Sequence, residues 1–426
     1  MISVSRLISK IIFFLILYIP LEELFLKWLP VPDSIFESLH VISDFFIAVI
    51  IFLFLYLSSS RSRFRLTITK LTLTVFLLVA FFSFLMSFAS FAGYFSKIWV
   101  LLRYIFIYFI LLNIKLNKEE LNRFYLILGV SFCIQIFIGL LLLLDISYIN
   151  LFFEAREGVL KIIVPEDTIK GTFKFGVFYG FFVMVSFVIL YPYTKSSFVK
   201  VVLVTTSIIF TYYSGSRVAF LGVIGYILYR HFRENKVLIF TMVCGFIVFI
   251  FASGIAAEVD NIGSLLGLFS ADFWLASLSS GRLGIFNIVP MFFDASIKEI
   301  LFGFSYDVTG ITSFLYQDYD NLSAILKNNA IVGIEDVYWI AFLYYYGIFG
   351  ILLFAMFYAN FIFKVNRLFL MSHDSEHRML IQSIKYLVAF AVIVGFVNQV
   401  FHIKTFAFYF WVFAAVATHR ARFYTS

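Results

Sequence analysis

The chain has 426 residues, of which 62% are hydrophobic and only 13% charged, with a formal net charge of +7. In soluble globular domains about half of the residues are apolar and about a quarter are charged. This composition therefore excludes a soluble globular domain and indicates a polytopic membrane protein. The only two cysteines, Cys133 and Cys244, lie within apolar runs, which excludes a disulfide framework or a thiolate metal site.

Twelve apolar segments approach the length of roughly 20 residues that a membrane-spanning helix needs. The first follows basic residues, as in a signal peptide, but no small-residue cleavage site comes after it, so we expect a retained helix. The fold class predicted is an all-α polytopic membrane protein with a single transmembrane domain, 1–426. In chain order the segments are 8–29, 40–58, 71–90, 97–114, 123–144, 173–192, 198–213, 217–229, 237–254, 337–363, 384–401 and 405–418.

The distribution of basic residues predicts the orientation of these helices. If the N-terminus is cytoplasmic, the cytoplasmic loops and helix ends carry 20 of the 32 Lys and Arg residues but only 5 of the 25 Asp and Glu residues. Cytoplasmic loops are enriched in Lys and Arg, so both termini are expected to be cytoplasmic. Two longer loops, 145–172 and 255–336, then lie outside, and any chemistry belongs there. The basic charge suits anionic lipid rather than nucleic acid.

The stretch "TYYSGSRVAFLG", residues 211–222, places an arginine between two apolar segments. Ser214 or Ser216 can cap the following helix, which puts Arg217 in its first turn. The positive end of the helix dipole disfavours a cation there, so Arg217 suggests an anion bound at the same place.

The same arrangement returns in "SLSSGRLGIFNIVPMFF", where Ser280, Gly281 and Arg282 open a second helical pattern. Backbone amides at a helix N-terminus, together with a guanidinium, form a receptor for phosphate or diphosphate. The apolar spacing predicts an amphipathic helix lying on the membrane surface or on the helix bundle. Its apolar face is expected at Leu283, Phe286, Val289 and Phe293.

Arg103 is a third cation, about two turns into a helix that starts on the outer side. Ionisable residues within a membrane are costly and are functional by default. Two simpler interpretations stay open for Arg103 and Arg217. Either arginine could reach the lipid headgroups, or it could pair with an acid. Arg282 could be a solvated loop residue. The acids available for pairing are Asp44, Glu22 and Glu23.

Four stretches together resemble a known family: "IPLEELFLKWLP", "YYSGSRVAFLG", "SSGRLGIFNIVPMFFDASIKEILFGFS" and "EDVYWIAFLYYYGIFGILLF". They are similar to the region shared by Wzy-type O-antigen polymerases and WaaL-type O-antigen ligases. The resemblance implies a membrane fold related to C-type glycosyltransferases, acting on undecaprenyl-diphosphate-linked glycans at the periplasmic face of the bacterial inner membrane. It implies that Arg217 and Arg282 bind the donor diphosphate with help from Arg103. Ser216, Ser280 and Gly281 would support them.

The resemblance also implies a base that removes a proton from the incoming sugar hydroxyl. The ligases carry a histidine-asparagine pair at the position where this chain has "GIEDVYW". Asp336 takes the place of that histidine and Glu335 is the alternative, although two acids at a helix start also suit its dipole. None of the six histidines falls in the outer loop 255–336, which favours a polymerase over a ligase.

The polymerase interpretation requires no cofactor and no metal, because the diphosphate bond supplies the activation. The expected partners are lipid-linked glycan donor and acceptor, membrane lipid, and proteins that regulate chain length or flip the substrate. The ligase and a polysaccharide-lipid flippase remain as rivals. We interpret "QDYDN", with Asp318 and Asp320, as a solvated acidic loop and His402 with Lys404 as a headgroup contact. The basic loop residues Arg156, Lys161, Lys170 and Lys174 could line a substrate path.

Overall fold

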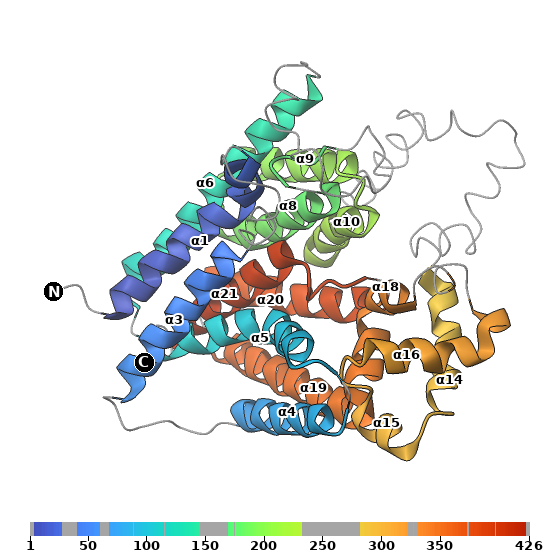
Figure 1. The fold of residues 1–426 in the computed structure, drawn as a ribbon. Coiled ribbons are helices and arrows are strands. Elements are labelled where there is room, and N and C mark those ends of the chain that lie inside the picture. Colours follow the sequence, from blue (N-terminus) through green and yellow to red (C-terminus); the bar gives the residue numbers. More distant parts are fainter. Residues whose placement is uncertain are drawn as a thin grey trace, which may run out of the picture.

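The computed structural model describes residues 4–27, 41–59, 68–87, 89–114, 116–144, 169–173, 175–231, 282–322, 327, 330–372, 375–396 and 398–422. Throughout these ranges the regular elements are helices (Figure 1). The first part contains α1 (Val4–Lys27), α3 (Ile42–Ser59), α4 (Ile68–Leu85), α5 (Phe91–Asn113), α6 (Lys118–Leu143), α8 (Gly176–Leu190), η1 (Tyr191–Tyr193), α9 (Ser197–Tyr213) and α10 (Arg217–His231). The second part contains η3 (Arg282–Asn287), α14 (Ile288–Phe292), α15 (Ile297–Phe302), α16 (Val308–Leu315), η4 (Tyr316–Asn321), α18 (Ala330–Glu335), α19 (Tyr338–Met371), α20 (Ser375–Val394) and α21 (Lys404–Arg422).

Eleven of the twelve predicted apolar segments coincide with a long helix, and the twelfth, 237–254, lies outside the described residues. Six of the described helices have the length and apolar composition of a membrane span, and α3, α4 and α9 contain shorter apolar stretches. A helical membrane protein is thereby confirmed, while the twelve-span topology stays a prediction. Figure 1 shows both chain ends on one side of the bundle and α14, α15 and α16 on the other.

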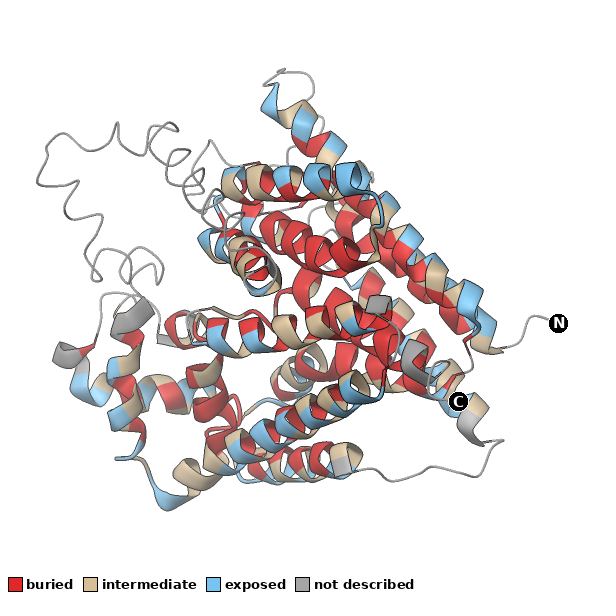
Figure 2. Ribbon diagram, turned by 180° about the vertical axis from the view of Figure 1, so that it is seen from behind, coloured by how far each residue is buried: buried red, intermediate tan, exposed pale blue. Residues whose placement is uncertain are grey.

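Two helices form the centre of the bundle. α8 and α21 are buried along almost their whole length and pack against each other. Helices that are apolar on every side belong in the interior of a large bundle. The outer helices α1, α3, α4 and α6 are exposed along one side, as Figure 2 shows.

The turn between α9 and α10 is built as its sequence predicts. Gly215 has a φ of 68°, a conformation that glycine adopts without steric cost. The Ser216 hydroxyl accepts a hydrogen bond from the Ala219 amide at 3.4 Å and so caps α10. Glycine at position 176 of α8 is required beside this turn, because a Cβ there would lie 2.3 Å from the Ser214 carbonyl oxygen.

Gly347, with a φ of 64°, breaks α19 nine residues after its start. A broken helix leaves carbonyl groups without intrahelical partners, and inside a membrane these groups must be satisfied by other parts of the protein. The segment after α15 does so here. The Phe304 amide donates to the Tyr344 carbonyl at 2.8 Å, and the Ser305 amide donates to the Tyr345 carbonyl at 3.0 Å.

The end of α15 lies against this break with almost no space between the two backbones. A Cβ on Gly347 would lie 2.5 Å from the Leu301 carbonyl, and one on Gly303 would lie 2.5 Å from the Tyr346 amide nitrogen. The stretches "FGFS" and "YYYG", both within the motifs of the family resemblance, therefore form one packed unit.

The predicted amphipathic segment after Arg282 packs against the bundle mainly through residues other than those of the expected face. Ile285, Ile288 and Phe292 are the buried residues, whereas Phe293 is 53% exposed. One reason is that the segment starts as a 3-10 helix, whose three residues per turn shift the apolar stripe. The second is its partner, because the Tyr344 hydroxyl of α19 donates to the Ile288 carbonyl at 2.9 Å. Phe286 and Val289 are only partly buried, and the Leu283 side chain lies outside the described part.

Candidate functional site

Six charged residues from five helices and one histidine from a turn lie near one another in the bundle. They come from the later part of α1, the starts of α3 and α21, the first half and middle of α5, the end of α18, and the turn before α21. We call these residues the charge cluster: Glu22, Asp44, Lys97, Arg103, Glu335, His402 and Lys404.

Arg103 and Asp44 form the most deeply buried pair of the cluster. The Arg103 Nη1 atom donates to both carboxylate oxygens of Asp44, at 2.5 and 2.6 Å, and the arginine is only 8% exposed. Asp44 lies in the first turn of α3, where a carboxylate suits the helix dipole. Pairing with Asp44, one of the two simpler interpretations of Arg103, is therefore confirmed. The Arg103 Nε atom is buried and has no hydrogen-bond partner among the described residues.

The second pair joins Glu22, near the end of α1, to Lys404, the first residue of α21. Glu22 is 4% exposed, and its Oε1 atom is buried without a hydrogen-bond partner in the described part of the chain. The two buried pairs also interact with each other, because Glu22 lies within electrostatic range of Arg103 and Asp44 lies within range of Lys404. They therefore behave as one charge-balanced unit.

Glu335 forms the third and most accessible pair. Its Oε1 atom accepts hydrogen bonds from the Lys97 ammonium group and from the Tyr345 hydroxyl, the latter at 2.7 Å. The side chain of Glu335 keeps 24% of its surface exposed, so a bound molecule can reach the carboxylate. Tyr345 also stacks on Tyr306 with ring centroids 3.9 Å apart.

Tyr306 and the preceding Ser305 have positive φ angles of 65° and 49°. Side-chain-bearing residues rarely adopt this region, and such strain concentrates at functional sites. The Ser305 hydroxyl is buried without a described hydrogen-bond partner. The backbone beside Glu335 is therefore held in a conformation that local preferences oppose.

His402 lies in the turn between α20 and α21, with its ring centroid 5.3 Å from that of Tyr338. Burial, together with the positive charge of Lys97, lowers the pKa of His402 to about 4. The imidazole is therefore neutral at pH 7 and can accept a hydrogen bond. Nothing in the sequence indicates that the His402 imidazole is held neutral. The prediction that His402 contacts a lipid headgroup rested only on the neighbouring Lys404.

The other predicted residues fall at several places. Asp336 lies half-buried in the turn after α18, where its amide donates to the Gly333 carbonyl at 3.3 Å. Arg217 is the first residue of α10, as predicted, and its side chain is exposed. α10 packs against α8, α9 and α20, whereas α5, which carries Arg103, packs against α3 and α21. The two arginines thus belong to different parts of the helix bundle.

Several predictions fall outside the described residues. They include Ser280, Gly281 and the loop 145–168 with Arg156 and Lys161. Arg282 begins η3, but its side chain is not described, so a joint site of Arg217, Arg282 and Arg103 stays a prediction. Asp318 is exposed in η4, as expected for a solvated acidic loop.

Lys97, Tyr345 and Tyr306 are the site residues that the sequence interpretation missed. The spacing of Lys97 from Arg103, six residues along one apolar helix, offers a weak signal, since a second intramembrane cation needs a second acid. Nothing local in the sequence indicates that the acid is Glu335, 238 positions away.

The chain matches no family model, and comparisons with curated proteins and with solved structures find no match either. The resemblance to the polymerases and ligases therefore rests on the quoted motifs alone.

Proposed function

We propose that the protein is a membrane glycosyltransferase that polymerises undecaprenyl-diphosphate-linked oligosaccharide repeat units at the periplasmic face of the bacterial inner membrane. The observation that carries the proposal is the arrangement around Glu335. A partly exposed carboxylate lies between a lysine and a tyrosine, and this tyrosine, Tyr345, belongs to the "YYYG" stretch that packs against "FGFS". The two motif stretches that support the family resemblance thus pack beside a candidate base.

The reaction exchanges one carbon–oxygen bond for another. A hydroxyl oxygen at the non-reducing end of the acceptor unit bonds to the anomeric carbon of the growing glycan. The bond from that carbon to the donor diphosphate breaks, and its electron pair leaves with the diphosphate. The hydroxyl proton passes to a carboxylate, which general-base catalysis requires to be within hydrogen-bond reach.

Glu335 is the better-positioned base, and Asp336 in the adjoining turn is the alternative. The Lys97 ammonium group and the Tyr345 hydroxyl both donate hydrogen bonds to the Glu335 carboxylate and so fix its orientation. Holding a catalytic group in one orientation lowers the entropic part of the barrier.

The donor diphosphate needs positive charge that the cluster does not supply. The three cations of the charge cluster form ion pairs with its three carboxylates, and its histidine is neutral. Arg282 would provide that charge and stabilise the leaving group as the bond breaks, since η3, which it begins, packs against α18 and α18 ends at Glu335. Arg217 lies in a different part of the helix bundle, so its contribution to the same diphosphate site stays a prediction. Arg103, already bound to Asp44, would act at most through its unpaired Nε atom.

The carrier lipid requires a site at the membrane edge, since a long prenyl tail stays in the bilayer. The segment from α14 to α16 carries large apolar side chains with high exposure: Phe293 at 53%, Ile297 at 77% and Val308 at 52%. Exposed apolar groups on a membrane protein are suited to contact with lipid. A tail could therefore approach the cluster along this segment.

A polysaccharide-lipid flippase is the second candidate, and the break in α19 favours it. Discontinuous helices that meet buried charges are typical of transporters, and Gly347 interrupts α19 close to the cluster. An O-antigen ligase would use the same donor. The outer loop 255–336 contains no histidine, but the neutral His402 of the charge cluster lies within electrostatic range of Glu335, so the ligase stays an alternative.

Glycolipids from a strain lacking the protein would separate polymerase from ligase. Lipid A-core bearing a single repeat unit supports the polymerase, because ligation then works without polymerisation. Bare core with accumulated lipid-linked polymer supports the ligase instead.

Release of free undecaprenyl diphosphate by the purified protein separates a transferase from a flippase. Glu335→Gln should reduce this release about 10²-fold to 10⁴-fold, the usual contribution of a general base. Asp318→Asn, in an exposed part of the same outer segment, is the matched control and should release it at the wild-type rate. Equal release by wild type and Glu335→Gln would remove Glu335 as the base. No release by wild type would favour the flippase.

A further inference from the structure

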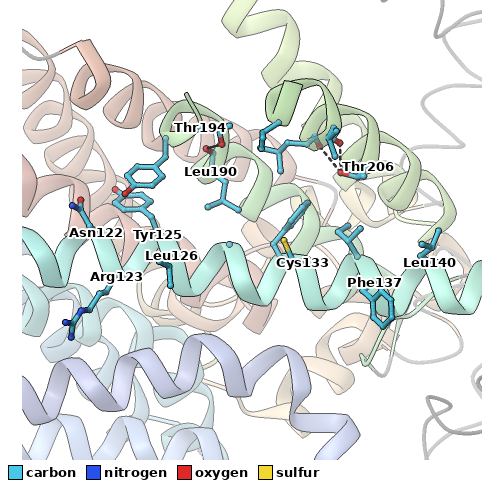
Figure 3. A pocket seen from close by; sticks show the side chains of 17 residues that line it. Asn122, Arg123, Tyr125, Leu126, Cys133, Phe137, Leu140, Leu190, Thr194 and Thr206 are labelled. Carbon is cyan, nitrogen blue, oxygen red and sulfur yellow. Dashed lines mark hydrogen bonds between the residues drawn. The ribbon is translucent and has the colours of Figure 1, made fainter. Parts of the chain in front are cut away.

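An apolar groove runs along α6, away from the charge cluster. It lies between α6 and the segment formed by α8, η1 and α9, and its volume is about 710 Å³ (Figure 3). Figure 3 shows Asn122, Arg123 and Thr194 toward one end, and Phe137 and Leu140 at the other. The groove therefore has a polar end and a long apolar body.

The described residues that line the body of the groove are mostly apolar, and the exposed Cys133 thiol is a weakly polar exception. The hydroxyl of Thr206 is used within α9, where it donates to the Val202 carbonyl at 2.8 Å. Gly129 forms part of the lining, and a Cβ added there would meet only Leu190, at 4.0 Å. The absence of a side chain at position 129 thus keeps the middle of the groove open.

The helix that forms one wall of the groove is suited to a hydrocarbon environment. α6 has 26 residues and an apolar window of mean hydropathy 2.7, so it is long and apolar enough to cross the membrane. Several lining residues are well exposed, including Leu126 at 64% and Phe137 at 60%. Within a bilayer such surface is covered by lipid chains or by another protein.

The polar end carries an excess of positive charge. Arg123 lines it, and Lys118, Lys195 and Lys200 lie within a few positions of lining residues, against two acids, Glu119 and Glu120. Lys200 lies over the Tyr191 ring, 5.6 Å from its centroid. Basic residues beside an apolar groove at a membrane surface attract anionic headgroups. The basic end of the groove is complementary to a negatively charged headgroup, so the expected occupant is an anionic lipid.

We propose that the groove binds one acyl chain of an anionic phospholipid, with the headgroup at the basic end near Arg123. The chain would lie along Gly129 and Cys133, and the phosphate would lie near the start of α6. The site is independent of the proposed transferase reaction, because it shares no residue with the charge cluster.

Lipid retention by the purified full-length protein tests the proposal. Native mass spectrometry would compare phosphatidylglycerol with phosphatidylcholine of the same acyl chains. We expect wild type to retain one phosphatidylglycerol about tenfold better than phosphatidylcholine. Gly129→Leu should abolish this preference by filling the groove. Val130→Leu is the matched control, because Val130 is 45% exposed on α6 but does not line the groove.

Alkylation of Cys133 gives a second readout that does not depend on gas-phase stability. Cys133 lines the groove and is exposed, and substituting Cys244 with serine leaves it as the only thiol. We expect phosphatidylglycerol to slow its reaction with a membrane-permeant maleimide at least fivefold. Phosphatidylcholine should slow the reaction much less.

Three results would overturn the proposal. Equal retention of the two lipids would remove the anionic headgroup from it. Retention by Gly129→Leu equal to wild type, or Cys133 alkylation unchanged by lipid, would show that the chain lies elsewhere. Concentration-dependent dimers that Gly129→Leu disrupts would show that a second copy of the protein covers the groove.

Discussion

Two regions of the helix bundle illustrate two ways of placing charge in a membrane protein. In the charge cluster, Arg103 and Lys97 of α5 pair with the carboxylates of Asp44 and Glu335. In α10, α19 and α20, cations also hydrogen-bond to neutral oxygens. Lys364 donates to the Tyr108 hydroxyl at 3.1 Å, Arg378 donates to the Ser372 carbonyl at 2.7 Å, and Arg230 donates to the Gln382 amide oxygen.

The difference indicates different tasks. Buried ion pairs fix the positions of their side chains but leave little net charge, and removing one partner is costly. Hydrogen bonds to neutral acceptors hold a cation near the end of a helix, where it can also contact anionic lipid. The charge cluster is therefore the better place for chemistry, and the region of Lys364, Arg378 and Arg230 fits the predicted cytoplasmic side.

The largest effect should come from breaking the most buried pair. Arg103→Ala leaves the Asp44 carboxylate without its partner in an apolar environment, and should reduce the free energy of unfolding by about 3–5 kcal/mol. Denaturant titration in detergent micelles would measure it. The double variant Arg103→Met with Asp44→Leu should recover most of the loss. If Arg103→Ala left stability unchanged, the pair would have no structural role.

Acid should weaken the charge cluster through His402. Its folded pKa of about 4 lies below the ordinary value of 6.5. Above pH 6.5 both states are neutral, whereas between pH 6.5 and 4 only the unfolded state takes up the proton. Stability therefore falls as pH falls through this window. At about 1.36 kcal/mol per pKa unit, and allowing for the partial exposure of the ring, the loss is roughly 2 kcal/mol.

Unfolding measured from pH 7 to pH 4 for wild type and His402→Gln would isolate this contribution. The variant should lose less stability across the window, because its side chain does not titrate. Parallel curves for the two proteins would show that His402 is not held neutral in the folded state.

The smallest effect is expected in the region of Lys364, Arg378 and Arg230. Lys364→Met removes one hydrogen bond to Tyr108 and the cation above its ring, at 5.4 Å. The loss of a hydrogen bond to a neutral hydroxyl and of one cation–π contact should reduce the unfolding free energy by about 1 kcal/mol or less. A loss as large as that of Arg103→Ala would show that the two regions do not differ as described.

Local patterns in the sequence predicted the elements well. The hydropathy pattern located the helices, because each helix is apolar along most of its length whatever its position in the bundle. The serine-glycine turn before Arg217 identified the start of α10. The possible partners of Arg103 were also few, because a buried cation needs an acid and the neighbouring segments contain few acids. Its pairing with Asp44 was among them.

What the sequence by itself determined is thus the class of protein, the positions of its helices and the residue types that need partners. Only the tertiary structure decided which partners meet. Glu335 bonds to Lys97 across 238 positions, α15 packs into the break of α19 at Gly347, and the apolar face after Arg282 turns toward Tyr344. The physical reason is that helix formation depends on a few neighbouring residues, whereas ion pairing and close backbone contact depend on packing between segments distant in the chain.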